Sequence, residues 1–314
     1  MSGIKYSVLG FGDSNYDDFC GHARKLDERI GALGGSRIAD RASCEPDYED
    51  TAGGWLDNVI KAMSHHHPPT PPAPGDRVVV VSEPADSSAA PSIRTGTFSR
   101  KNPFVTTLTR NHRLNGDGSA KDVRNFAFHL PSDILPYTTG DALGVWPLND
   151  HTLIDEWLDV TGLTGDEPVN VWGDDMTFRR ALRERLEFAK VSSDFVRFAA
   201  DRNGSGDLHA LAAPGNKQKL TDWAWGRQPV DVLAEYPVEA SPEEWVDVLK
   251  SLTPRQYSIS SSPREKADEV QLTVSTVRYN HLGRPRGGVC STFLADHADD
   301  TQDIGVFVTH AANF

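Results

Sequence analysis

The sequence predicts a multidomain chain: a partial α/β segment of the parallel-sheet type, then an antiparallel β-barrel that an all-helical insert interrupts. Three observations predict this order. Residues 1–63 alternate between strand and helix patterns. Strand patterns dominate residues 77–150 and return over 253–314, whereas helical periodicity fills 151–252. The length of 314 residues is enough for two or three domains.

The α/β segment reads as strand, loop, helix, strand, helix. Tyr6 to Gly10 is an apolar run, and the turn-forming letters GFGDSNY overlap its end. Ser36 to Ile38 is a second short strand, and Gly34 with Gly35 ends the helix before it. Two helical stripes are apolar: Phe19, Ala23, Leu26, Ile30 and Leu33; then Trp55, Leu56, Val59, Ile60 and Met63. This order is typical of a doubly wound sheet with its ligand loop at a strand's carboxyl end.

Residues 64–76 are predicted to be a linker. Five prolines in SHHHPPTPPAPG favour an extended, semi-rigid polyproline geometry. The three histidines are adjacent and have no further ligand nearby in the sequence, so a solvated linker is favoured over a metal site. We predict no metal.

Strand patterns fill both parts of the predicted barrel. Before the insert they cover Arg77 to Glu83, Phe104 to Arg110, Asn125 to Leu130 and Tyr137 to Asn149. After it they cover Tyr257 to Ser261, Glu269 to Tyr279 and Ile304 to His310. The predicted barrel therefore comprises 77–150 and 253–314.

Apolar stripes mark helices within the insert, 151–252. They are formed by Ile154, Trp157 and Leu158; by Phe178, Leu182 and Leu186; and by Trp245, Val248, Leu249 and Leu252. Ser241 to Glu244 has the spacing of a capping box, with proline at the first helical position, so a helix should begin there.

Composition excludes several classes of protein. No run approaches 18 apolar residues, so no membrane span or membrane partner is expected. The net charge of −13 argues against a nucleic-acid groove and is compatible with docking on a basic redox partner. Cys20, Cys44 and Cys290 are far apart, and the first residues lack a signal-peptide pattern. We therefore expect a cytoplasmic protein without a disulfide scaffold.

The stretch TPRQYSISSSP, from Thr253 to Pro263, has side chains that suit a flavin dinucleotide. Arg255 offers a planar fork for pyrophosphate, Tyr257 a flat ring for the isoalloxazine, and Ser258 a hydroxyl for the ring nitrogen that accepts hydride. Taken alone, the same letters also fit a strand end followed by a serine-rich turn.

A second stretch, GGVCSTFLAD, follows about thirty residues later. Gly287 and Gly288 allow a close approach of backbone to phosphate, and Ser291 and Thr292 are further donors. Cys290 could be a reactive thiol, but such a thiol needs an electropositive setting, so a small residue packed beside the flavin is favoured. The second stretch, together with the family resemblance described next, makes the flavin interpretation the better one.

The two stretches resemble the paired FAD loops of the ferredoxin–NADP reductase superfamily, R-x-Y-S and G-x-x-S/T. The chain also resembles, over nearly its whole length, the diflavin reductases, and among them most closely the NADPH-dependent sulfite reductase flavoproteins. Matching stretches are YSVLGFGDSNYDDFC, NPFVTTLTRN, KDVRNFAFHL, TGDALGVWPLND, GDEPVNVW, LTPRQYSISSSP, VQLTVSTVRY, GGVCSTFLAD and VFVTHAANF.

The resemblance implies a flavodoxin-like FMN domain, a hinge, an FAD barrel with a helical connecting insert, and an NADPH domain. It implies that NADPH reduces FAD, that FAD passes electrons to FMN, and that a haem or iron–sulfur subunit or domain accepts them. Two alternatives remain open: an FAD-binding module without NADPH turnover, and a donor to another acceptor such as a nitrate or nitrite reductase or a haem oxygenase.

The resemblance also implies site residues. For FAD they are Arg255, Gln256, Tyr257, Ser258, Thr273, Val274, Ser275, Tyr279, Gly288, Val289, Cys290 and Ser291, with Ser258 as the catalytic residue and Tyr279 at the adenosine half. For FMN they are Phe11, Gly12, Asp13, Ser14, Asn15, Tyr16, Phe19 and Cys20, with Tyr16 stacked on the ring.

Two segments of the family pattern are absent from the sequence. The phosphate-cradling loop and the next glycine-rich flavin loop would precede Met1, and the NADPH domain would follow Phe314. We therefore expect a truncated reductase with a partial, weak FMN site and without efficient NADPH oxidation.

Overall fold

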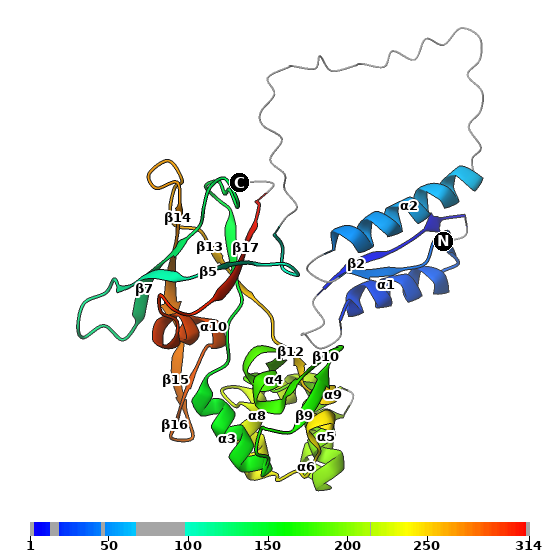
Figure 1. The fold of residues 1–314 in the computed structure, drawn as a ribbon. Coiled ribbons are helices and arrows are strands. Elements are labelled where there is room, and N and C mark those ends of the chain that lie inside the picture. The colour runs from blue at the N-terminus through cyan, green and yellow to red at the C-terminus, as the bar shows by residue number, and fades with distance from the viewer. Residues whose placement is uncertain (1–2, 13–18, 45–47, 67–97, 214, 312–314) are drawn as a thin grey trace. The chain divides into compact units, whose positions relative to one another are not determined.

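The computed structural model describes residues 3–12, 19–44, 48–66, 98–213 and 215–311. The chain divides into two compact units, Met1–Arg94 and Thr95–Phe314 (Figure 1). The predicted strand from Arg77 to Glu83 and residues 67–76 of the predicted linker lie outside the described residues.

The described residues of the first unit form two pairs of short parallel strands. β1 (Lys5–Tyr6) pairs with β3 (Ser36–Arg37), and β2 (Leu9–Phe11) pairs with β4 (Ala42–Cys44). The predicted strand from Tyr6 to Gly10 is therefore divided, because its two halves bond to different partner strands. Helices α1 (Gly21–Ala32) and α2 (Glu49–His66) lie on opposite faces of these strands (Figure 1).

Both predicted helices of the first unit are present, but one boundary differs. The α2 helix ends at His66, so residues 64–66, the predicted start of the linker, are helical. Leu56, Ile60 and Met63 of α2 are exposed, whereas Trp55 is half-buried and its Nε1 donates to the Ser7 hydroxyl at 2.8 Å. The helix thus has an apolar stripe wider than the face that it buries.

The described part of the second unit contains two antiparallel sheets of more than two strands. A four-stranded sheet has the order β13-β8-β17-β5, and a three-stranded sheet has the order β14-β7-β6. Their strands are β5 (Phe104–Thr106), β6 (Leu108–Arg113), β7 (Asp122–His129), β8 (Ala142–Val145), β13 (Arg255–Ser258), β14 (Glu269–Thr276) and β17 (Ile304–Thr309). An isolated bridge between Ile259 and Leu272 links β13 to β14. The strands before the insert thus pair directly with those after it, as the sequence predicts.

The sheets enclose an apolar core that includes Phe126, Phe128, Leu143 and Val306. In the four-stranded sheet, Gly144 of β8 lies between Gln256 of β13 and Phe307 of β17. A Cβ at Gly144 would lie 2.3 Å from Cζ of Phe307, so only glycine leaves room for that ring.

Helices dominate the insert between β8 and β13, as predicted (Figure 1). They are α3 (His151–Thr161), α4 (Phe178–Glu184), α5 (Ser193–Asn203), α6 (Gly206–Ala212), α7 (Lys217–Ala224), α8 (Pro229–Glu235) and α9 (Pro242–Val248). Trp157 and Trp245 pack edge to face in their core, with ring centroids 5.1 Å apart. The predicted capping box is confirmed: the Ser241 hydroxyl accepts from the Glu244 N–H, and the Glu244 carboxylate accepts from the Ser241 N–H. No helix in the described ranges is long and apolar enough to cross a membrane.

The insert is not all-helical, which corrects the prediction. A hairpin joins β9 (Pro168–Val171) to β10 (Asp174–Thr177), and β11 (Leu186–Glu187) pairs with β12 (Lys250–Ser251). Leu186 accordingly lies on a strand and not on the helix stripe with Phe178. These strands have only two to four residues, which is too short for an alternating pattern to be recognised among neighbouring residues with helical periodicity.

The strand predicted from Glu269 to Tyr279 is interrupted at Val277. There the Val277 N–H donates to the Ser291 hydroxyl at 3.1 Å, and its carbonyl accepts from the Gly288 N–H at 3.0 Å. The chain then forms a hairpin of β15 (Arg278–His281) and β16 (Arg284–Gly287), followed by α10 (Val289–Thr292) and the π-helical turn η1 (Phe293–His297). The second glycine-rich stretch thereby lies beside the end of β14.

Candidate functional site

The first predicted flavin stretch forms β13 at the edge of the four-stranded sheet. Its side chains alternate: Gln256 and Ser258 are exposed, and Arg255 and Tyr257 are half-buried. Ser258 pairs with Ala142, which in turn pairs with Thr309, so these three residues form one row across the sheet. The Ser258 hydroxyl is thus on a surface that rigid strands support.

Arg255 already has an anionic partner. Its Nη2 donates to Glu187 Oε2 at 2.9 Å, and its Nη1 donates to the carbonyl of Thr253 at 2.7 Å and to the hydroxyl of Thr253 at 2.6 Å. Glu187 comes from the helical insert and is buried, whereas 38% of the Arg255 side chain is exposed. These bonds fix the guanidinium and leave part of it accessible to a ligand.

Tyr257 connects the two flavin stretches because it packs against the apolar core that contains Cys290, and its side chain interacts with that thiol. Burial raises the pKa of Tyr257, and the neighbouring Cys290 raises it further. Cys290 is 2% exposed, its Sγ lies 3.9 Å from the carbonyl oxygen of Val145, and burial raises its pKa to about 12. At neutral pH the thiol is therefore protonated. Because a nucleophile needs the thiolate form, Cys290 is better explained as a small residue that packs in the core.

The strand β14 presents alternate residues to solvent. Thr273 and Ser275 are exposed, and the Thr273 hydroxyl donates to the Ser260 hydroxyl at 3.1 Å. Val274 lies in the core between the sheets. Of the three residues predicted to line the cofactor, Val274 can thus offer a ligand only its backbone.

The second stretch depends on glycine for its shape. A Cβ at Gly287 would lie 2.5 Å from Cγ2 of Thr292, and a Cβ at Gly288 would lie 2.8 Å from the hydroxyl oxygen of Ser291. The Thr292 hydroxyl donates to the carbonyl of Gly288 at 2.8 Å, and the buried Ser291 hydroxyl accepts from the Val277 N–H. The predicted hydroxyl donors therefore hold the loop together.

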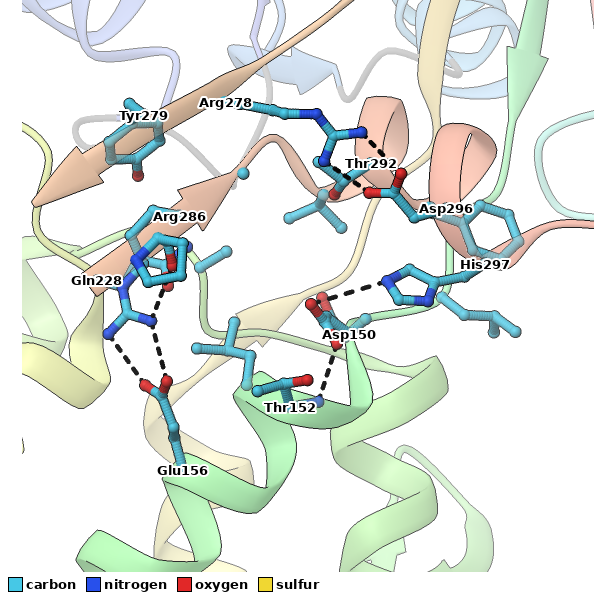
Figure 2. Close-up of a pocket in the computed structure, with 18 residues that line it drawn as sticks. Asp150, Thr152, Glu156, Gln228, Arg278, Tyr279, Arg286, Thr292, Asp296 and His297 are labelled. Carbon is cyan, nitrogen blue, oxygen red and sulfur yellow. Dashed lines mark hydrogen bonds and ion pairs between the residues drawn. The ribbon is translucent and has the colours of Figure 1, made fainter. Parts of the chain in front are cut away.

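A cavity of about 280 Å³ adjoins this loop (Figure 2). Its walls come from the start of α3, the hairpin β15–β16, and α10 with η1. Of the residues predicted for FAD, Tyr279 and Val289 line it. Tyr279 is partly exposed, and burial of its other side raises its pKa. The cavity thus offers an aromatic face next to a glycine loop.

Three charged clusters surround the cavity (Figure 2). The Arg278 guanidinium donates to both carboxylate oxygens of Asp296 at 2.7 Å, and this bidentate pair lowers the pKa of Asp296. His297 lies 3.7 Å from Asp150. The third cluster joins Arg286 to Glu156 and to Asp231.

The sequence analysis did not identify the charged residues Glu187, Arg286, Asp231 and Glu156. Their partners lie between 55 and 130 residues away along the chain, so no local pattern could reveal them. One signal was present: Gln228 to Asp231 repeats the proline-containing spacing of the capping box at Ser241. That signal predicts a helix start, not an ion pair.

The predicted FMN residues lie in the first unit. Phe11 is exposed, and its ring meets that of Tyr48 edge to face at 5.2 Å. The Gly12 N–H donates to the carbonyl of Cys44 at 2.9 Å, and Phe19 packs against the core cluster that contains the buried Cys20. Asp13, Ser14, Asn15 and Tyr16 lie outside the described residues.

Comparisons with known proteins match both units. Residues 96–293 match the FAD binding domain family, and residues 1–55 match the flavodoxin family. Similar proteins include three that are called sulfite reductase [NADPH] flavoprotein alpha-component. The chain is 37% identical over 314 residues to that of Mannheimia succiniciproducens, 35% over 314 to that of Escherichia coli O9:H4, and 34% over 323 to that of Bacillus subtilis.

Each of these comparisons covers the whole of this chain but only 50–51% of the relative. The chain thus spans about half the length of the curated relatives that it matches. Because the matched domain covers residues 96–293, more than half of the chain, and a flavodoxin segment precedes it, the chain belongs to the FAD binding domain family and has the domain order of the diflavin reductases.

Proposed function

We propose that the second unit holds FAD as the FAD-binding part of an NADPH-dependent diflavin reductase of the sulfite reductase type. One observation carries the proposal: the stretches around Arg255 and Gly288, which belong to different strands and loops, meet where Tyr257 packs against the core that contains Cys290. A fixed guanidinium, an aromatic ring, an exposed serine and a glycine loop are therefore gathered beside the sheet edge.

The residues present suit the two ends of FAD. In the proposal, Arg255 faces pyrophosphate, Tyr257 supports the isoalloxazine ring, and the Ser258 hydroxyl donates to the ring edge. The Gly287–Gly288 loop offers backbone to the pyrophosphate, and Tyr279 contacts the adenosine half at the cavity. Bound FAD would supply the chemistry of hydride acceptance and single-electron transfer. The protein's own part is to bind, orient and shield the ring.

The proposed domain plan assigns 77–150 and 253–314 to one FAD-binding barrel, 151–252 to the connecting insert, and 1–63 to part of an FMN domain. Pairing of β8 with both β13 and β17, and the bridge from Ile259 to Leu272, support a barrel built from both halves. In the proposed electron path, NADPH reduces FAD, FMN receives single electrons, and a haem or iron–sulfur protein accepts them. The names of the similar proteins support sulfite reductase as the system served.

Identification of the bound flavin tests the proposal. The purified chain should release FAD in preference to FMN when it is denatured and its flavin is separated by chromatography. A colourless chain that does not take up added FAD would contradict the proposal. Titration with riboflavin in parallel would show whether the adenylate half contributes to binding.

A further inference from the structure

A buried ion cluster joins the hairpin β15–β16 to the helical insert. Only 4% of the Arg286 side chain is exposed. Its Nη2 donates to Asp231 Oδ1 at 2.7 Å and lies 3.0 Å from Glu156 Oε2, and its Nη1 donates to Glu156 Oε1 at 3.2 Å. Figure 2 shows the Arg286 guanidinium directed at the Glu156 carboxylate. Burial disfavours the charged guanidinium, but the two carboxylates outweigh this effect and raise its pKa.

Each member of the cluster belongs to a different element. Asp231 is in the first turn of α8, and its other oxygen accepts from the Gln228 N–H at 2.9 Å, which fixes the start of that helix. Glu156 is on α3, and Arg286 is on β16. A single guanidinium therefore ties two helices of the insert to the hairpin.

The hairpin also carries the proposed cofactor contacts. Arg286 pairs with Tyr279 across the two strands, so both side chains lie on the same face. Arg286 immediately precedes Gly287 and Gly288, and it lines the cavity together with Tyr279. Any movement of Arg286 would therefore move the aromatic face and the glycine loop together.

The chemistry of the cluster favours positioning over simple stability. A buried ion cluster is rarely more stabilising than apolar residues of the same volume, but its directional bonds allow one arrangement. In addition, the Nε of Arg286 is buried and has no hydrogen-bond partner in the described part of the chain. The cluster thus does not saturate the guanidinium, and one donor remains on a residue that lines the cavity.

We infer that Arg286 is a positioning residue for FAD: held by Asp231 and Glu156, it fixes Tyr279 and the Gly287–Gly288 loop around the cavity that receives the adenylate half. The inference rests on the proposed function. Because Arg286 acts only on that half of the cofactor, its loss should weaken FAD and leave riboflavin, which lacks the adenylate and both phosphates, almost unaffected.

Titration of the flavin-free chain with FAD and with riboflavin tests the inference. In Arg286→Met the Kd for FAD should rise about tenfold or more, whereas the Kd for riboflavin should stay within about twofold. Arg284→Gln is the matched control: Arg284 is on the same strand, is 45% exposed and lies 3.5 Å from Asp231. Both Kd values of this control should stay within about twofold. Equal weakening of both ligands in Arg286→Met, or of neither, would overturn the inference.

Two further variants keep the test decisive if Arg286→Met does not fold. Glu156 is 32% exposed, so Glu156→Gln removes a negative charge that holds Arg286 at little cost in packing, and the Kd for FAD should rise about threefold to tenfold. Arg286→Lys keeps the positive charge but not the planar fork of donors, so it should retain more FAD affinity than Arg286→Met. If Arg286→Met does not fold, Arg286→Lys should still weaken the binding of FAD more than that of riboflavin. Failure of the wild-type chain to bind FAD would contradict the proposed function itself. FAD binding that Glu156→Gln and Arg286→Lys leave unchanged would overturn only the inference about Arg286.

Discussion

The two stretches proposed to hold FAD are built in opposite ways. On β13, Gln256 and Ser258 are exposed, and Arg255 is held by Glu187 with part of its guanidinium accessible. In α10, the Ser291 and Thr292 hydroxyls bond to the chain's own backbone. The first stretch thus presents side chains to a ligand, whereas the second uses its side chains for its own shape.

Because of this difference, substitutions in the two stretches should affect FAD affinity and stability in different proportions. A stretch that recognises a ligand by side chains can lose affinity without losing stability, because its exposed groups support little else. A loop that recognises a ligand by its backbone and shape cannot lose affinity without losing stability, because the same atoms maintain its fold. Effects on FAD affinity and on unfolding should therefore separate on β13 and coincide at Gly287–Thr292.

The largest effect on stability is expected at Gly287. Gly287→Ala places a Cβ 2.5 Å from Cγ2 of Thr292, so the free energy of unfolding should fall by about 1–3 kcal/mol, and FAD retention should fall with it. Urea denaturation of the flavin-free chain measures this change. Gly116→Ala is the control, because nothing lies within 4 Å of a Cβ there. Equal unfolding of the two variants would contradict the description of the second loop.

Arg255 should show the opposite behaviour. Glu187 is buried, so the fair comparison is Glu187→Gln/Arg255→Ala against Glu187→Gln alone, in which no unpaired carboxylate remains. Loss of a bond to a charged group costs about 1.5–3 kcal/mol, so FAD affinity should fall about tenfold or more. Riboflavin affinity and urea stability should hardly change. Equal losses for FAD and riboflavin would show that Arg255 does not contact phosphate.

The burial of the Cys290 thiol should appear in the dependence of stability on pH. The pKa of Cys290 is raised to about 12 in the folded chain, so above its unfolded value the folded state binds more protons than the unfolded state. The free energy of unfolding should therefore fall as the pH rises from about 9 to about 12. Cys290→Ala should show a shallower fall, measured by urea denaturation across this range. Identical slopes in the two proteins would place the Cys290 thiol in solvent.

The smallest effect is expected at Ser258. Its hydroxyl is exposed on β13, so Ser258→Ala should change the free energy of unfolding by no more than about 0.5 kcal/mol. A neutral hydrogen bond contributes about 0.5–1.5 kcal/mol, so FAD affinity should fall by about tenfold at most. Fluorescence titration would measure it. A larger loss than that of the Arg255 substitution would reverse the ranking within β13.

The sequence was most informative where local pattern governs structure. The strand alternation, the capping box at Ser241 and the return of β structure after the insert are all present. The break at Val277 was not predictable, because it depends on a hydrogen bond from Ser291, which is 14 residues away. The ion pairs of Arg255 and Arg286 likewise depend on which distant elements meet, and local periodicity contains no such information.

The candidate site shows the same division. The residue types that suit FAD were readable because flavin chemistry needs a cation, a ring, a hydroxyl and glycine in short stretches. Which of them face a ligand was not readable: the hydroxyls of Ser291 and Thr292 suggested phosphate donors and instead bond to backbone. A polar side chain next to glycine can bind a ligand or bond to the loop's own backbone, and only the folded structure shows which of the two it does.

A crystal structure of the chain with FAD bound would show which groups hold the pyrophosphate. We expect pyrophosphate oxygens within hydrogen-bond distance of the Arg255 guanidinium and of backbone N–H groups at Gly288 and Val289, with the Ser291 hydroxyl still bonded to Val277. The adenine should lie beside Tyr279. Pyrophosphate bound by the Ser291 and Thr292 hydroxyls, or FAD bound away from both β13 and Gly287–Gly288, would contradict the proposed mode of binding.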